Sequence, residues 1–277
     1  MEVVAAVWRS PTGRVGLILA VLLVCGALLA PLLPLWPPNR IDVAARLSPP
    51  SAVHWLGTDH LGRDLLSRCL FGARVALGLS LTVTGLAMVV GTVIGVGMAY
   101  APRWAERAGL VVFDLIGAYP TVILALALVA IFGPGVNNLL VLITLVFVPQ
   151  FGRIARAQTM SLRHRPFLEA EITLGASPAR ILFHHVLPNV LGPVIVLASM
   201  NIPFVITLEA GLSFLGFGIR PPLASWGSTL YDGFIYLDQS AWPAVTAGVA
   251  LSLATLAFTL LGESLQGYLD PLRRSRA

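Results

Sequence analysis

Lysine is absent from this 277-residue chain, so all 18 of its basic residues are arginines. Without lysine the phosphate-binding P-loop, G-x-x-x-x-G-K-[ST], cannot occur, and the chain cannot hydrolyse ATP by that device. Cysteine is scarce as well, because Cys25 and Cys69 provide neither a disulfide framework nor a metal-binding spacing. Charged residues make up only 11% of the chain, and this composition excludes an ordinary soluble protein.

Long apolar runs are what the chain has in abundance. Hydrophobic residues make up 57% of it and its mean hydropathy is +0.85. Several runs reach the ~20 residues that a helix needs to cross the hydrocarbon core of a membrane. We therefore predict an all-α polytopic membrane protein with six transmembrane helices. The expected spans are residues 15–35, 75–100, 109–132, 136–154, 189–211 and 242–262.

The first apolar run also suggests a signal peptide. It is too long for that, and no good small-x-small cleavage site follows it, so we expect a retained span. The whole pattern divides the chain into four parts. These are an N-terminal cytoplasmic segment with span 1 (1–35), an extracytoplasmic segment with a surface helix (36–74), a transmembrane domain with spans 2–6 (75–262) and a cytoplasmic tail (263–277).

The distribution of arginine predicts which side of the membrane each loop occupies. The termini, the turn at residues 101–107 and the region 153–180 together hold 12 of the 18 arginines. Arginine-rich loops stay on the cytoplasmic side. We therefore expect a multi-pass protein of the bacterial cytoplasmic (inner) membrane with both termini in the cytoplasm. Because the arginines follow the loops in this way, they do not indicate nucleic-acid binding.

A polar segment rich in helix breakers, residues 161–188, lies between spans 4 and 5. Pro166 suits the first turn of a helix, and Gly175 supplies a left-handed stop. Ser177 is a good N-cap directly before Pro178. The pattern predicts two short helices that meet at a bend, the second of which runs toward Pro188. Such an elbow is either a grip for a soluble partner or an ordinary amphipathic loop.

Residues 54–74 carry a second polar pattern, on the outer side. Gly57 and Gly62 are typical turn residues, and leucines at helical spacing after them predict a lid helix on the membrane surface. Asp59 is expected to cap the start of that helix. Four residues also suit a metal ion, but no single helix face collects them, so we favour a folded turn without a metal. These residues are His54, Asp59, His60 and Asp64.

Three acids fall at or near membrane depth: Asp114, Glu209 and Glu263. A charge at the centre of a span costs ~2.5–3.5 kcal/mol on insertion scales, so such residues usually face protein or water. Asp114 and Glu263 lie near cytoplasmic ends, where we expect pairing with arginines or contact with the interface. Glu209 either lines a path or holds a packed helix end. Glu209 and Asp114 would also suit an ion-driven secondary transporter or a channel.

Ser213 superficially resembles the nucleophile of an intramembrane protease. Nucleophilic catalysis needs a base within hydrogen-bond reach of the serine. His184 and His185 precede Ser213 by 28 or 29 residues, which is about 40 Å along a continuous helix at ~1.5 Å per residue. We therefore expect no catalytic residue in this chain.

The elbow resembles a family pattern. Glu169-Ala170, then Gly175, then Leu187-Pro188 is similar to the EAA loop of ATP-binding-cassette (ABC) importer permeases, whose short helix docks into a groove on a cytosolic ATPase. The chain departs from this pattern at Glu171, where the family usually has alanine. It departs again at His185, where an aliphatic residue is common.

Two outer stretches resemble one subgroup of that family. HWLGTDHLGRDLLSRCLFGAR, residues 54–74, is similar to the H-x-L-G-T-D-x-x-G-R-D-x-x-S-R signature of the C-type subunits of dipeptide, oligopeptide and nickel importers. Residues 209–227 resemble a further stretch of the same subgroup at the outward end of the transport path. The resemblance extends from His54 to Pro271, and it implies the type I ABC importer permease (MetI-like) fold.

The resemblance also implies partners, roles and a mechanism of alternating access. A second permease subunit would complete a heterodimer within the membrane lipid, two cytosolic ATPase subunits would bind ATP and Mg, and an extracytoplasmic solute-binding protein would deliver the cargo. No cofactor is expected in this chain. Dipeptides or oligopeptides are the default cargo, nickel or a nickel chelate the alternative, and other small solutes stay open. The implied ATPase-coupling residues are Phe167, Leu168, Glu169, Ala170, Ile172, Gly175, Leu187 and Pro188, and those suggested to line the path are Glu209 and Ser213.

Overall fold

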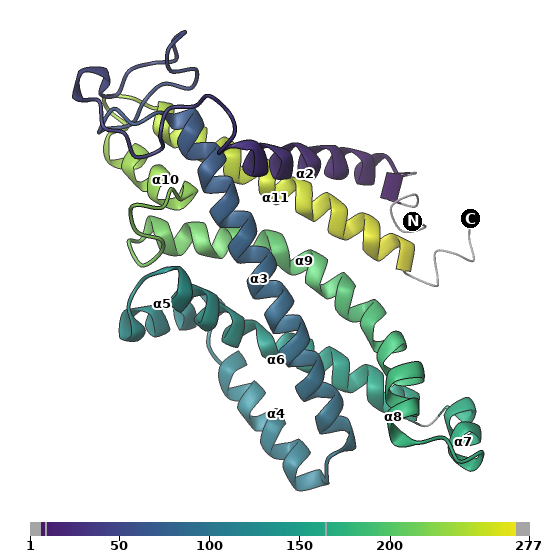
Figure 1. The fold of residues 1–277 in the computed structure, drawn as a ribbon. Coiled ribbons are helices and arrows are strands. Elements are labelled where there is room, and N and C mark those ends of the chain that lie inside the picture. The colour runs from purple at the N-terminus through teal and green to yellow at the C-terminus, as the bar shows by residue number, and fades with distance from the viewer. Residues whose placement is uncertain (1–6, 9, 164, 270–277) are drawn as a thin grey trace.

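The computed structural model describes residues 7–8, 10–163 and 165–269, and these residues form helices and loops with no β-strand. Long helices cross one another in a bundle, with α3 running through its middle (Figure 1). The long helices are α2 (Pro11–Leu29), α3 (Leu65–Tyr100), α4 (Arg103–Gly117), α5 (Thr121–Phe132), α6 (Val136–Arg163), α9 (Leu187–Phe214) and α11 (Trp242–Leu269). The shorter elements are η1 (Val43–Ala45), α7 (Pro166–Thr173), α8 (Pro178–Arg180), the π-helical turn η2 (Ile181–Val186) and α10 (Trp226–Ile235).

Five helical stretches of the described chain are long and apolar enough to cross a membrane. A sixth is completed by α4 and α5 if these two helices, bent by 89° at a short break, form one span. The break contains Tyr119 and Pro120, a pair that predicts a kink within the expected span 109–132, and Pro120 is the N-cap residue of α5. The expectation of an all-α polytopic protein is confirmed.

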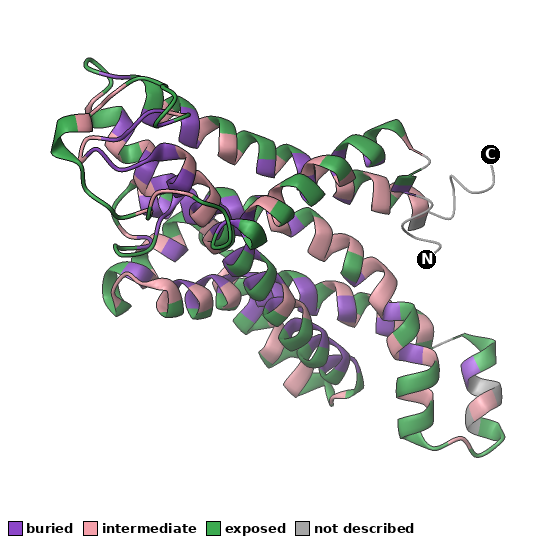
Figure 2. Cartoon of the chain, turned by 45° about the horizontal axis from the view of Figure 1, so that its top comes forward, coloured by how far each residue is buried: buried purple, intermediate pink, exposed green. Residues whose placement is uncertain are grey.

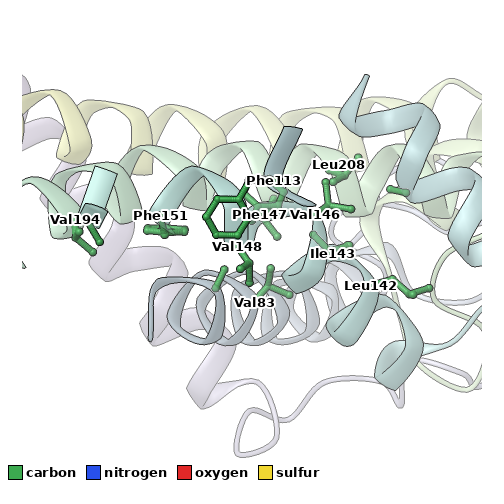
Figure 3. Close-up of a cluster of buried hydrophobic side chains, with 14 of the residues drawn as sticks. Val83, Phe113, Leu142, Ile143, Val146, Phe147, Val148, Phe151, Val194 and Leu208 are labelled. Atoms are coloured by element: carbon green, nitrogen blue, oxygen red, sulfur yellow. The ribbon is translucent and has the colours of Figure 1, made fainter. Parts of the chain in front are cut away.

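Close approach of two backbones joins α3 to α6. A side chain at Gly95 would place its Cβ 2.2 Å from the carbonyl oxygen of Gly152, and one at Gly91 would come within 2.7 Å of the oxygen of Val148. Small residues permit such contacts between membrane helices. Glycines recur along α3 at positions 78, 85, 91, 95 and 97, a spacing that predicts close helix packing, but Gly78, Gly85 and Gly97 have nothing within 4 Å of the corresponding position. Around the contact, Phe147 and Phe151 of α6 fill the larger buried cluster (Figure 3).

The start of α2 and the end of α11 lie together. The hydroxyl oxygens of Ser10 and Ser264 are 3.2 Å apart. The segment 36–64 and α10 gather at the opposite end of the bundle (Figure 1). The two ends of the membrane domain are therefore built from different parts of the sequence.

Two elements differ from the sequence expectation. The expected surface helix is instead the first ten residues of α3, because no proline interrupts residues 65–100. Asp64, not Asp59, is its N-cap and accepts a hydrogen bond from Ser67 N at 2.8 Å. The second elbow helix likewise does not stop at Pro188 but continues through η2 into α9, so that the span covers Pro178–Phe214. Pro188 follows the wider π-helical turn, which tolerates a residue without an N–H group.

Candidate functional site

The elbow forms as its breakers predict. α7 begins at Pro166, and Gly175 adopts φ +82° just beyond the helix end. Ala176 N donates to Glu171 O at 3.0 Å, which is the 6→1 hydrogen bond of a Schellman stop with Gly175 at its left-handed position. Ser177 Oγ then accepts from Arg180 N at 3.3 Å and caps the next helix. The bend therefore depends on local residues alone.

The elbow projects from the bundle and most of it is exposed (Figure 2). Leu168 anchors α7 with only 1% of its surface exposed, whereas Phe167 is 44% and Leu174 83% exposed. Leu187 is half-buried and Pro188 exposed at the other arm. Glu169, Ala170 and Ile172 lie on α7, but their side chains are outside the described part of the chain. An apolar surface without a covering element is thus present at the end of the bundle.

The two departures from the EAA pattern face each other across the elbow. His185 Nε2 lies 3.7 Å from Glu171 Oε1, and the rings of His185 and Phe167 are 6.1 Å apart. Glu171 belongs to α7 and His185 to η2, so the contact joins the two arms. The sequence comparison identified both positions without indicating that they meet.

At the outer end, buried ion pairs tie the segment 36–64 to α3 and α10. Asp59 is fully buried, and its carboxylate is 2.6 Å from Arg63 Nε and 3.4 Å from Arg68 Nε. Arg63 Nη2 also lies 3.2 Å from Asp232 Oδ2 on α10, and Arg68 Nη2 donates to Thr229 Oγ1 at 3.3 Å. Burial raises the pKa of Asp232, while the nearby His60, Arg63 and Arg68 oppose the rise. We call these charged residues, Asp59, His60, Arg63, Arg68 and Asp232, the outer ion-pair cluster.

The four residues weighed as metal ligands are not brought to one point. His54 Nδ1 lies 2.9 Å from Asp64 Oδ1, whereas His60 lies 3.5 Å from Asp232. Oxygen and nitrogen atoms of Asp59, His60 and Asp232 do come within 4.8 Å of one another. Arg63 contacts both of these carboxylates, however, and its guanidinium occupies the place where a cation would be attracted. The cluster is therefore better described as a set of ion pairs.

Glu209 is enclosed at the outer end of α9. It is 1% exposed, and its Oε1 accepts hydrogen bonds from Ser213 Oγ at 2.6 Å and Ser225 Oγ at 3.0 Å. Each hydroxyl in turn accepts a backbone N–H, Ser213 that of Ile219 and Ser225 that of Gly227. The carboxylate thus fixes the loop between α9 and α10 and the start of α10. This geometry favours the packed helix end, and a role in lining the path stays a prediction for Glu209 and Ser213.

The remaining candidates have simple surroundings. Asp114 pairs with Arg153 at 2.7 Å between its Oδ1 and Nη2, as expected for an acid near a cytoplasmic end. Glu263 is exposed near the end of α11. Ser213 has a carboxylate rather than a histidine beside it. The described residues therefore show no serine–histidine pair at this position.

Comparison with known proteins decides the family. The family of binding-protein-dependent transport system inner membrane components matches residues 91–275. The chain belongs to this family. The permease also shares its fold with the methionine ABC transporter MetNI in inward-facing conformations, with a TM-score of 0.56 over 77% of this chain and 96% of that chain at 19% identity.

Relatives of the permease carry names from one branch of the family. It is 38% identical to the dipeptide transport system permease protein of Alkalihalophilus pseudofirmus, over 96% of this chain and 88% of that protein. It is 36% identical to the glutathione transport system permease protein of Pectobacterium atrosepticum, over 86% and 79%. It is 34% identical to the probable D,D-dipeptide transport system permease protein of Escherichia coli, over 95% and 88%.

Sequence reasoning missed the outer ion-pair cluster of the permease. It singled out Asp59 and His60 but assigned nothing to Arg63, Arg68 or Asp232. A signal was present, since Arg63 and Arg68 stand at the two arginine positions of the outer signature. Their partner on α10 lies 169 residues away from Arg63 in sequence, and no local pattern indicates that pairing.

Proposed function

We propose that this permease pairs with a second permease subunit to form the pathway of an ATP-driven importer that moves dipeptides or oligopeptides across the cytoplasmic membrane. The names of the relatives support peptides, and they favour peptides over nickel. Two cytosolic ATPase subunits and an extracytoplasmic solute-binding protein complete the importer. Both termini lie in the cytoplasm, which the arginine distribution supports.

The observation that carries the proposal is the elbow. It is a short helix with a defined stop, it projects from the bundle, and it offers exposed apolar residues such as Phe167 and Leu174. A rigid helix of this kind transmits movement when an ATPase grips it. ATP binding carries α7 inward with the closing ATPases, the spans rock to open outward, and hydrolysis reverses the change. The permease needs no catalytic residue for this task.

The test changes the stop while leaving the surface intact. Gly175→Val places a β-branched residue at φ +82° with no atom within 4 Å of the new Cβ, so only backbone strain is introduced. Such strain costs about 1–2 kcal/mol for an L-residue in the left-handed region. Gly175→Asn is the matched control, because asparagine tolerates that conformation. We expect the valine variant to insert normally but to lose ATPase subunits in a pull-down, and to lose ATP-driven dipeptide uptake.

Uptake assays separate the alternatives. Transport of a labelled dipeptide that requires ATP and the binding protein supports the proposal. If the same complex transports nickel but not the dipeptide, the proposed cargo is wrong and the proposed mechanism stands. Uptake that persists without ATP and collapses with the ion gradient would replace the mechanism by ion coupling through Asp114 and Glu209. Equal behaviour of Gly175→Val and the parent would reduce the elbow to an ordinary loop.

A further inference from the structure

A cavity of about 1030 Å³ lies behind the elbow, between the last turns of α3 and the start of the span that includes α9. Apolar side chains dominate its wall, and none of the described residues that line it is acidic. One wall of the cavity is formed by five residues of α3, which are Thr92, Val93, Val96, Gly97 and Tyr100. The elbow side is formed by residues from Ala176 to Leu187, with Arg163 and Leu168 closing the remaining wall.

The cavity changes character with depth. From Thr92 to Tyr100 the wall follows α3 for eight residues, about 12 Å at ~1.5 Å per residue. Val93 and Val96 make the middle of this wall aliphatic, Thr92 adds one hydroxyl at its deep end, and Tyr100 and Arg163 lie at the other end. The guanidinium of Arg163 lies 4.9 Å from the centre of the Tyr100 ring and donates to Ala99 O. Aromatic and basic residues are typical of the membrane–water interface.

Three further arginines lie close in sequence to residues of the lining. Arg103, Arg165 and Arg180 are all exposed, and each lies within three residues of a lining residue in the sequence. Basic pockets between spans on the cytoplasmic side attract anionic lipid headgroups. The occupant that fits an apolar interior and a basic mouth is an amphiphile with an anionic head.

We propose that this cavity binds an anionic phospholipid of the cytoplasmic leaflet, with an acyl chain along α3 and the phosphate at Arg163. The lipid fills the space between α3 and the elbow and supports the elbow from behind. This proposal depends on the membrane orientation given above and does not depend on the cargo. The cavity shares Leu168 and Leu187 with the expected ATPase-coupling residues, whereas the exposed Phe167 and Leu174 are not part of its lining.

Gly97 allows the cavity to be filled without disturbing the fold. It lines the cavity, it is exposed, and nothing lies within 4 Å of an added Cβ. Gly97→Leu therefore enters the lipid space. Gly78→Leu is the matched control, because Gly78 is an equally open and exposed glycine of α3. It lies 19 residues earlier, about 28 Å away along the helix at ~1.5 Å per residue, in the outer half of the span.

The experiment uses the assembled complex in nanodiscs that contain phosphatidylglycerol or phosphatidylcholine with photoreactive acyl chains. Crosslinked peptides are mapped by mass spectrometry. We expect phosphatidylglycerol to label residues 92–100 and 176–187 in the parent and in Gly78→Leu, and this labelling to be lost in Gly97→Leu. Arg163→Gln should lower the preference for phosphatidylglycerol about fivefold, which corresponds to ~1 kcal/mol for one basic residue near an anionic surface.

Other results would overturn the proposal. Equal labelling by the two lipids would show that the cavity does not select an anionic headgroup. Lipid labelling of these residues in the isolated permease but not in the assembled complex would make the cavity a subunit interface. Unchanged labelling in Gly97→Leu would place the lipid elsewhere. Co-purification of the ATPase subunits and dipeptide uptake, measured on the same preparations, report on the proposed function separately from lipid binding.

Discussion

The two ends of this permease are held together in different ways. At the outer end, Asp59 is fully buried between Arg63 and Arg68, and these arginines reach Asp232 and Thr229 of α10, far away in the sequence. At the inner end, Leu174 and Phe183 are 83% and 62% exposed, and one leucine anchors α7. Both ends expose apolar side chains, Trp55 and Phe234 at the outer end among them, but within the described part of the chain only the outer end is held by a cluster of buried ion pairs. The difference indicates which end is built to stay fixed and which to be moved by partners.

The largest loss of stability at the outer end is expected when Asp59 is removed. Asp59→Ala leaves Arg63 and Arg68 buried without their shared carboxylate, so the free energy of unfolding should fall by about 3–5 kcal/mol. Thermal unfolding of the purified protein in detergent measures the loss. Asp238→Ala, at an exposed acid of the same outer region, is the control and should change little. A stable Asp59→Ala protein would show that the cluster does not hold the outer end.

Removing Glu209 should cause a second, smaller loss of stability at the same end. Glu209→Ala removes the acceptor of the Ser213 and Ser225 hydroxyls, and each buried polar group left unpaired costs about 1–3 kcal/mol. Glu209→Gln keeps an acceptor oxygen and should lose much less. Thermal unfolding compares the two variants, and dipeptide uptake is measured beside it. Loss of uptake with full stability in Glu209→Gln would instead favour a role for the carboxylate in the path.

The pH dependence of stability tests whether burial or the neighbouring arginines dominate at Asp232. Because burial raises the pKa of Asp232 in the folded state, its favourable contribution is complete below the ordinary aspartate pKa and is lost as pH rises through the folded pKa. The charged groups that face it are His60, Arg63, Arg68 and Asp59. Asp232→Asn cannot ionise, so the stability of the parent relative to this variant should decrease as pH rises. An increase over the same range would mean that the arginines outweigh burial.

The smallest effect is expected at the elbow. Glu171 and His185 are partly exposed and 3.7 Å apart, so their coupling should be only about 0.2–1 kcal/mol, as for other solvent-exposed ion pairs. A double-mutant cycle with Glu171→Ala and His185→Leu, the residue types usual in the family, measures it through pull-down of the ATPase. If the double variant binds the ATPase better than either single variant, the two departures compensate each other. Strictly additive effects would show that they act independently.

How much the sequence predicted depends on the range of each interaction. The stop at Gly175, the cap at Ser177 and the break at Tyr119-Pro120 were predictable because each rests on residues a few positions apart. The outer cluster was not, because it joins Arg63 to a residue 169 positions later. Glycine spacing gave a mixed result for the same reason. Gly95 meets α6 while Gly97 faces a cavity, and only the arrangement of neighbouring helices distinguishes them.

The wrong prediction of a separate surface helix also has a physical cause. The leucines after Asp64 repeat at helical spacing, which indicates a helix but contains no signal for where it ends. The polar composition of residues 36–74, which are rich in proline and glycine, placed this helix outside the bilayer. In the structure Arg68 is neutralised by Asp59, so the helix runs on without interruption into the span.

Because it is continuous, α3 acts as one rigid helix that connects the two ends of the bundle. Its 36 residues extend about 54 Å at ~1.5 Å per residue, well beyond the ~30 Å of a hydrocarbon core. No proline interrupts it, and it runs as one continuous α-helix. One end is fastened by ion pairs and the other borders the cavity behind the elbow. A movement imposed at the elbow end therefore turns α3 as one body about the end that the ion pairs hold.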